Sequence, residues 1–299
     1  LWFIYIGLTV IATSFYMAGG MDICDAICHA FTTMATGGFS TKNASMAHFN
    51  SPFIEYTSGI FMLLAGINYS LYFYVFRGNS LRLWKNNEFR FYLSVTLIAT
   101  IAITLSLWKT SYDSLHESVR YAFFQVASIM TTTGYATADY EKWTYFSQIA
   151  LVLLMFFGGM IGSTAGGIKQ VRILLMLKQG YREMYQLIHP HAVTALKIDG
   201  KFLTKEILGS IWGFLFLFLF VYAIATVAMT ATGIDIVTSA TTVLSTISNV
   251  GPALGEAGPA ENYSSIPIPG KWILIFCMLA GRLEIYTVLI LFVPHYWRR

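Results

Sequence analysis

The sequence is poor in charged residues. They make up 11% of its 299 residues, and hydrophobic residues make up 56%. A soluble domain carries about 25% charged residues, so this chain cannot cover a water-facing surface and must present apolar surface to lipid. The formal net charge is only +4, and no run of Lys and Arg interleaved with aromatic residues points to a nucleic-acid partner.

Cysteine is also scarce, with three residues in the chain. Cys24 and Cys28 lie four residues apart on one face of an expected short helix, and Cys277 lies in an apolar segment. No group of His and Cys residues has the spacing of zinc ligands. We therefore expect the cysteines to pack as small apolar side chains rather than to bind a metal or to act in redox chemistry.

Long apolar runs dominate the rest of the chain. A bilayer is crossed by about 20 helical residues, and six runs approach or exceed that length: 1–18, 53–76, 91–108, 143–161, 207–231 and 272–293. The first run starts abruptly at Leu1, with neither an initiator Met nor the charged region of a signal peptide. We expect no signal peptide, and we expect further sequence upstream.

Three shorter segments separate these runs and are not ordinary loops. Residues 22–34, 115–130 and 235–247 are compatible with helices but too short to span a membrane, and a turn rich in Gly, Thr, Ser or Asn follows each. This pattern predicts re-entrant segments, in which a half-helix enters the membrane and extended backbone returns. Such backbone is tolerated at membrane depth only where protein or a water-filled cavity satisfies its polar groups.

The three turns also align with one another without gaps. Residues 34–39, 130–135 and 247–252 place Gly38, Gly134 and Gly251 in register. A pair of small residues lies 24 to 30 positions beyond each glycine: Ala65-Gly66, Gly158-Gly159 and Ala280-Gly281. This internal repeat has a period of about 100 residues and predicts a unit of helix, half-helix, turn and helix.

The fold class predicted is therefore an all-α polytopic membrane protein built of tandem repeats of helix, half-helix, turn and helix. The expected units are 1–90 with a filter turn at 35–40, 91–205 with a turn at 131–136, and 206–299 with a turn at 248–253. The middle unit has a broken second helix over 143–188, because glycines interrupt it at 158–168.

Basic residues indicate the orientation. Thirteen of the 19 lie in the connections between the units or at the C-terminus: Arg77, Arg82, Lys85, Arg90, Lys169, Arg172, Lys178, Arg182, Lys197, Lys201, Lys205, Arg298 and Arg299. The positive-inside rule places these connections in the cytoplasm and the turns towards the outside. A helical bundle with basic loops is the alternative, but charge and sequence repeat in phase.

The aligned turns have the composition of a cation filter. A dehydrated cation needs fixed oxygens, which backbone carbonyls around a narrow axis provide, and glycine supplies the backbone freedom to aim them. No carboxylate occupies the turns, so selectivity would come from carbonyl dipoles, and Thr36 and Thr132 could add hydroxyl oxygens or brace the turn. The predicted cation-binding residues are Ala35, Thr36, Gly37, Gly38, Thr131, Thr132, Thr133, Gly134, Ser248, Asn249, Val250 and Gly251.

The half-helices support a cation in the same region. Acidic residues lie near their N-terminal ends: Asp22, then Asp113 or Glu117, then Asp235. An acidic residue at that end caps a helix and complements its positive pole. The negative C-terminal poles then point into the membrane. Ordinary capping without an ion explains the acids equally well.

The glycine-rich stretch 158–168 breaks a spanning run about halfway, and an amphipathic basic helix over about 169–188 follows it. Close helix packing through small residues is one interpretation. A phosphate-binding loop is possible in principle, but the motif Gly-x-x-x-x-Gly-Lys-Ser/Thr is absent. We favour a mobile intramembrane loop that acts as a gate, made of Gly162, Ser163, Thr164, Ala165, Gly166 and Gly167.

Arg282 lies in the middle of the last apolar run, where a charge is costly unless it faces the protein interior or water. Glu284 lies about 200° away around a helix and is not a local partner. We predict that Arg282 faces the pore and opposes cations as part of the gate. A structural ion pair with another helix is the alternative.

Together these motifs resemble the TrkH/KtrB family of potassium transporters over essentially the whole chain. The resemblance rests on the turns at 36–41 and 131–135, on 249–252, on the loop at 162–167 and on Gly281-Arg282-Leu283-Glu284. It implies potassium uptake across the cytoplasmic (inner) membrane through a selective, gated pore, and no enzymatic activity or organic cofactor. It further implies four units arranged pseudo-fourfold around one pore, with potassium as the ion bound by the turns. It also implies homodimers and a cytosolic nucleotide-binding regulatory subunit of the TrkA/KtrA type. This chain has three units, so we expect the first to be missing.

Two other functions compete with this interpretation. A proton- or sodium-coupled secondary transporter with a midplane site would also have discontinuous helices, but its repeats commonly have inverted topology, whereas these run parallel. An intramembrane enzyme with Ser163 as nucleophile would need a base at similar depth. The histidines, at positions 29, 48, 116, 189, 191 and 295, do not provide one.

Overall fold

A computed structural model describes residues 1–79, 81–192 and 195–297 of the chain. It is built of helices, and the strands in this part of the chain are the two-residue β1 (Lys197–Ile198) and β2 (Lys201–Phe202), which pair antiparallel. The predicted all-α fold is confirmed. Two of the basic residues used to predict the orientation, Arg298 and Arg299, lie outside the described residues.

Each predicted unit contributes its own helices. The first contains α1 (Trp2–Ala18), α2 (Ile23–Met34), η1 (Ser45–Phe49), α3 (Pro52–Ala65), α4 (Tyr69–Phe76) and α5 (Leu81–Lys85). The second contains α6 (Asn87–Leu107), α7 (Leu115–Met130), η2 (Tyr140–Lys142), α8 (Tyr145–Phe157) and α9 (Gln170–Ile188). The third contains α10 (Lys205–Thr230), α11 (Ile236–Ser248), η3 (Gly255–Ala257), α12 (Ile268–Arg282), α13 (Ile285–Leu289), η4 (Ile290–Phe292) and α14 (Pro294–Trp297).

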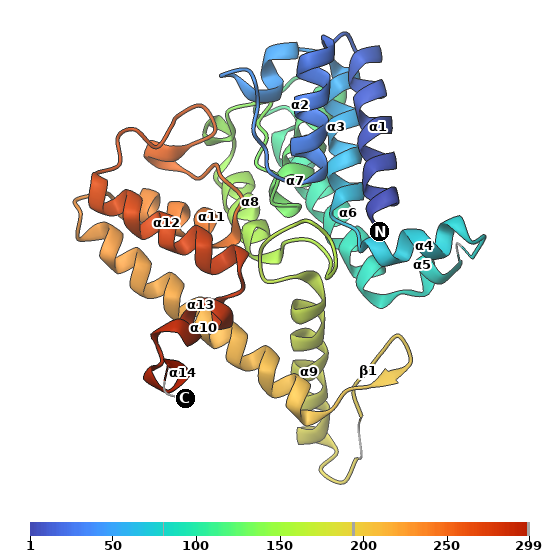
Figure 1. The fold of residues 1–299 in the computed structure, drawn as a ribbon, viewed down its shortest axis with the longest axis vertical. Helices are drawn as coiled ribbons and strands as arrows, with labels where there is room; N and C mark the ends of the chain where they lie inside the picture. The colour runs from blue at the N-terminus through green and yellow to red at the C-terminus, as the bar shows by residue number, and fades with distance from the viewer. Residues whose placement is uncertain (80, 193–194, 298–299) are drawn as a thin grey trace.

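The units pack in the same way and then join in series. In each one, the first helix, the half-helix and the second helix contact one another, as α1, α2 and α3 do. Contacts between α3 and α7 join the first unit to the second, and contacts between α8 and α11 join the second to the third. Helix α9 points away from these groups and lies beside the N-terminal part of α10 (Figure 1).

The half-helices begin where capping chemistry predicts. Asp22 caps α2, since its carboxylate accepts a hydrogen bond of 2.8 Å from the amide of Asp25, and Asp235 caps α11 in the same way at 3.0 Å. Helix α7 differs, because its N-cap is Ser114 and its acidic residue is Glu117 in the first turn. Asp113, one of the two acidic residues considered for the start of this helix, is therefore not its N-cap.

All three second helices break, not only the middle one. The chain bends by 97° between α3 and α4 and by 118° between α12 and α13, so the apolar runs at 53–76 and 272–293 are not straight helices. At the first bend Asn68 caps α4, accepting a hydrogen bond from the amide of Ser70 at 2.8 Å, and at the second bend Glu284 precedes α13 with φ 64°. The breaks fall at or close behind the small-residue pairs of the repeat in every unit.

Straight spanning helices are fewer than the six apolar runs suggested. Within the described residues, Asn87–Leu107 and Glu206–Thr230 are long and apolar enough to cross a membrane, and each bent pair would add one more span. Helix α1 has 17 residues and α8 has 13, which is short of the about 20 needed for a full crossing. Helix α8 ends early because Gly158 adopts φ 67° and turns the chain into the glycine-rich loop.

Candidate functional site: three aligned turns above an intramembrane loop

The three turns share one backbone conformation. The residue two positions before each aligned glycine is left-handed, although none of the three is glycine: Thr36 at φ 50°, Thr132 at φ 55° and Asn249 at φ 59°. The aligned glycines also have positive φ, at 66° for Gly38, 84° for Gly134 and 111° for Gly251. Non-glycine residues rarely adopt this conformation, so three instances at equivalent positions show that the turns are one structural element repeated.

The same hydrogen bond closes each half-helix onto its turn. The amide just before the aligned glycine donates to the carbonyl five residues earlier: Gly37 to Thr32 at 2.7 Å, Thr133 to Ser128 at 2.9 Å, and Val250 to Ser245 at 2.8 Å. These bonds satisfy carbonyls at the end of the half-helix and fix where the turn begins.

A set of hydroxyls braces the turns and was missed in the sequence. The Thr32 hydroxyl donates to the Phe39 carbonyl at 2.8 Å, and the Ser128 hydroxyl donates to the equivalent Tyr135 carbonyl at 2.6 Å. In the third unit the Ser245 hydroxyl instead accepts from the amide of Gly251 at 3.0 Å. The signal was present, because a Ser or Thr precedes every aligned glycine by six positions.

The turns lie side by side in sequence order. A Cβ atom placed on Gly38 would lie 1.8 Å from the carbonyl oxygen of Thr133, and one placed on Gly134 would lie 2.0 Å from that of Val250. Each of these glycines is therefore required for the close approach of the next turn. The structure thus brings together the predicted filter residues of neighbouring units.

The ring of turns is open on one side. A Cβ atom on Gly251 would meet no atom within 4 Å among the described residues. A cavity of about 630 Å³ lies here, lined on one side by the first turn, including Thr36 and Gly37, and on the other by the third turn and by helix α12. Gly38 and Gly134 each approach a carbonyl of the next turn, but Gly251 approaches none, so a gap remains between the third turn and the first.

The glycine-rich loop lies against all three turns. The amide of Gly166 donates to the Thr132 hydroxyl at 2.6 Å, and the Thr36 hydroxyl donates to the Thr164 carbonyl at 2.9 Å. A Cβ atom on Gly166 would lie 2.5 Å from the carbonyl oxygen of Ser248. The left-handed threonines thus brace the loop, and their hydroxyls are engaged there.

Arg282 meets the same loop from the last unit. Its guanidinium donates to the Thr164 carbonyl at 3.0 Å and lines both the cavity between the turns and a smaller cavity of about 230 Å³ beside the loop. Within the described residues it forms no ion pair, so the alternative of a structural pair is not what the geometry shows. The acid two positions on, Glu284, pairs instead with Arg172 at 2.9 Å.

The cysteines and acidic residues provide no metal centre in the described part of the chain. No group of three or more His, Cys, Asp or Glu side chains is placed to hold an ion. Cys24 is exposed, Cys28 half-buried and Cys277 buried, and all three are free thiols.

This geometry defines a class of protein: a helical membrane protein with repeated turns, each closed by the same hydrogen bond. Over residues 1–299 the chain matches the TrkH family, described as cation transport protein, and it belongs to that family. It is 43% identical over 300 residues to the Trk system potassium uptake protein TrkH of Salmonella typhimurium, and 44% identical over 302 residues to TrkH of Halomonas elongata.

The fold matches a solved structure of the same family. The crystal structure of the potassium transporter TrkH from Vibrio parahaemolyticus superposes with a TM-score of 0.94 at 38% identity, covering 99% of this chain and 64% of that one. The two curated relatives are covered over 100% of this chain but only 62% of their own length. The chain thus spans less than two thirds of the proteins it matches.

Proposed function

We propose that the chain supplies three of the units around a potassium-selective pore, and that potassium ions pass along the three aligned turns. The repeated conformation carries this proposal. Three turns with the same left-handed residue, the same hydrogen bond and the same positive-φ glycine bring their backbones together at one place. Carbonyl oxygens held in this way replace the hydration shell of a cation, and the curated relatives are potassium uptake proteins.

The filter in this proposal consists of Ala35 to Gly38, Thr131 to Gly134 and Ser248 to Gly251, with potassium as the transported ion and no organic cofactor or enzymatic reaction. Residues 162–167 and Arg282 form the gate. The support is that the loop bonds to Thr36 and Thr132 and abuts Ser248 directly, while Arg282 donates to the loop carbonyl of Thr164. A short segment in this position would obstruct ions that leave the turns.

The open side of the ring defines what else the pore needs. Because Gly251 faces an open cavity where Gly38 and Gly134 face the next turn, a fourth turn would close the ring between the third and first units. We propose that the described units form an incomplete pore without it. Potassium-selective flux through a single protomer of these 299 residues alone would overturn this part.

The orientation and partners follow from the same proposal. The turns face outwards from the cytoplasmic membrane, and the connections with their basic residues face the cytoplasm. Helix α9 carries basic residues on that side and joins the loop directly, so a cytosolic subunit of the TrkA/KtrA type would act through it. The homodimer implied by the family resemblance belongs to this proposal too.

Ion flux from the purified complete protein in lipid vesicles tests the function. We expect potassium uptake that exceeds sodium uptake and does not change when a proton or sodium gradient is imposed. Flux that requires either gradient would instead establish coupled transport, and equal flux of potassium and sodium would refute the assignment of the turns as a filter.

A further inference from the structure

A second cavity lies on the outer side of the turns. It has a volume of about 360 Å³, and its lining includes the aligned Gly38 and Gly134 together with Tyr263. Its charged lining residues are Lys42 and Glu261. Under the proposed function, every ion that enters the filter from outside crosses this mouth cavity, so a lysine in its wall requires an explanation.

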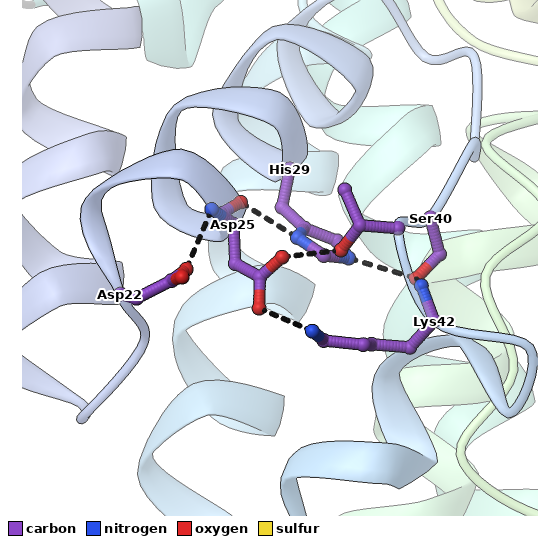
Figure 2. Close-up of polar contacts among 6 residues, drawn as sticks. Asp22, Asp25, His29, Ser40 and Lys42 are labelled. Carbon is purple, nitrogen blue, oxygen red and sulfur yellow. Dashed lines mark hydrogen bonds and ion pairs between the residues drawn. The ribbon is translucent and has the colours of Figure 1, made fainter.

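Lys42 is paired with an acid that does not line the mouth cavity. Its ammonium lies 2.9 Å from the carboxylate of Asp25, whose other oxygen accepts a hydrogen bond of 2.5 Å from the Thr41 hydroxyl (Figure 2). The Lys42 side chain is 33% exposed and that of Asp25 is 11% exposed. The hydrogen bonds from Thr41 and then Lys42 lower the pKa of Asp25, so its carboxylate stays charged at neutral pH.

A buried histidine fixes this arrangement. The carbonyl of Asp25 can only accept, so Nδ1 of His29 donates to it at 2.7 Å, and Nε2 accepts from the Ser40 hydroxyl at 2.9 Å. The Ser40 hydroxyl in turn accepts from the backbone amide of Lys42 at 3.0 Å. Figure 2 shows the resulting chain of contacts, which ties the half-helix α2 to the segment that returns from the first turn.

The pair belongs to one unit only. Four positions beyond the aligned glycine, where the first unit has Lys42, the second has Ala138 and the third has Gly255. Thirteen positions before it, where the first unit has Asp25, the others have Tyr121 and Thr238. The cation and its counter-ion therefore occur together, and the units that lack one also lack the other.

We propose that Asp25 is a positioning residue for ion entry, which neutralises Lys42 and draws its ammonium away from the mouth of the filter. This inference rests on the proposed function. An unpaired ammonium in the mouth cavity would repel each approaching cation and slow entry, whereas the pair has almost no net field at a distance. The repulsion is screened by salt, because the Debye length falls from about 30 Å at 0.01 M to about 8 Å at 0.15 M.

Potassium uptake by the complete protein in vesicles, measured at both ionic strengths, tests the inference. Asp25→Asn leaves Lys42 unpaired and should lower uptake about two- to five-fold at about 0.01 M salt, with a smaller loss at 0.15 M. Lys42→Met leaves an unpaired carboxylate and should raise uptake at low salt. The double variant, with the wild-type net charge, should return close to the wild-type rate, and the preference for potassium over sodium should not change in any of them.

A matched control distinguishes electrostatics at the mouth from other effects. Asp139→Asn frees Lys142 from a 3.1 Å ion pair that lies outside the lining of the mouth cavity, and it should leave uptake unchanged. If Asp25→Asn and Lys42→Met both lower uptake, the pair is a structural link and the inference is wrong. An equal loss with Asp139→Asn would also refute it. Absence of potassium uptake by the unmodified protein would instead refute the proposed function.

Discussion

The amide of Gly166 donates a hydrogen bond of 2.6 Å to the hydroxyl of Thr132, which attaches the glycine-rich loop to the second turn. Thr132 is left-handed, so the same residue shapes the turn and holds the loop against it. Thr36 repeats this in the first unit through the Thr164 carbonyl. The loop and the turns are therefore bonded directly to each other, although each turn is also closed by its own backbone hydrogen bond.

The first prediction concerns the gate. Arg282→Ala removes the hydrogen bond to the Thr164 carbonyl and a positive charge beside the loop. A hydrogen bond from a charged group contributes about 1.5–3 kcal/mol, so the loop should leave its position more often and potassium flux should rise about tenfold. Deletion within residues 162–167 should also raise potassium flux. Flux of potassium and sodium into vesicles measures both effects.

Selectivity provides the control for the gate. Both variants should keep the preference for potassium over sodium, because the turns are closed by bonds that do not involve Arg282. Arg77→Ala removes an exposed arginine that stacks on Phe73 and should leave flux unchanged. Folded gate variants that conduct at the wild-type rate would show that the loop and Arg282 only pack.

The second prediction concerns the filter. Gly134→Ser adds a side chain where a Cβ atom would lie 2.0 Å from the Val250 carbonyl, and it places serine at φ 84°. The left-handed conformation alone costs about 1–2 kcal/mol, so the turns must shift and the preference for potassium over sodium should fall about tenfold. Gly209→Ser is the matched control, because no atom lies within 4 Å of its Cβ position. Unchanged permeability ratios for potassium and sodium in Gly134→Ser would show that this turn does not form part of the filter.

The order of the helices and the register of the turns could be predicted from the sequence. The half-helices at 22–34, 115–130 and 235–247 coincide with α2, α7 and α11 to within a residue or so. This succeeded because each has an end signal, a capping residue at the start or a glycine turn at the finish, and because the turns repeat. Because the same element occurs three times, a boundary that is ambiguous in one copy can be fixed by alignment with the other two.

The bends in the second helices could not be predicted in the same way. Residues 53–76 and 272–293 are apolar throughout, and hydropathy does not distinguish a straight span from two helices at 97° or 118°. Asn68 caps the new helix at the first bend, and Glu284 adopts a positive φ at the second, but a single polar residue in an apolar run does not by itself predict a bend. The partner of Glu284, Arg172, is 112 positions away and required the tertiary structure.

The third prediction concerns pH. Burial lowers the pKa of His29 below its usual 6.5, against the opposing effects of its hydrogen bond to Asp25 and of the Asp25 charge, while the charge on Lys42 lowers it further. Tyr135 packs on the ring from the second turn. The unfolded chain then binds a proton before the folded one does. Stability is thus complete above about pH 6.5 and is lost as pH falls towards the folded-state pKa, by at most about 1.4 kcal/mol per pH unit.

The thermal unfolding midpoint in detergent, followed from about pH 7.5 to pH 5, measures this effect. It should fall with pH in the unmodified protein and fall less in His29→Gln, which cannot be protonated in this range. His116→Gln, which changes an exposed histidine at the start of α7, should retain the full dependence. Equal pH dependence in His29→Gln and the unmodified protein would show that another group is responsible.

The last prediction concerns the link between α9 and the break after α12. Arg172 of α9 pairs with Glu284 at 2.9 Å and stacks over the Phe214 ring of α10 at 3.9 Å, so one residue joins three helices next to the loop. Glu284→Gln removes the charge and keeps the shape. Because Glu284 is 52% exposed, the pair contributes only about 0.2–1 kcal/mol, and potassium flux should rise about two- to five-fold as α9 moves more freely. Glu183→Gln breaks an exposed pair with Arg182 farther along α9 and should leave flux unchanged. A lower flux in Glu284→Gln would mean that the pair holds the loop open rather than closed.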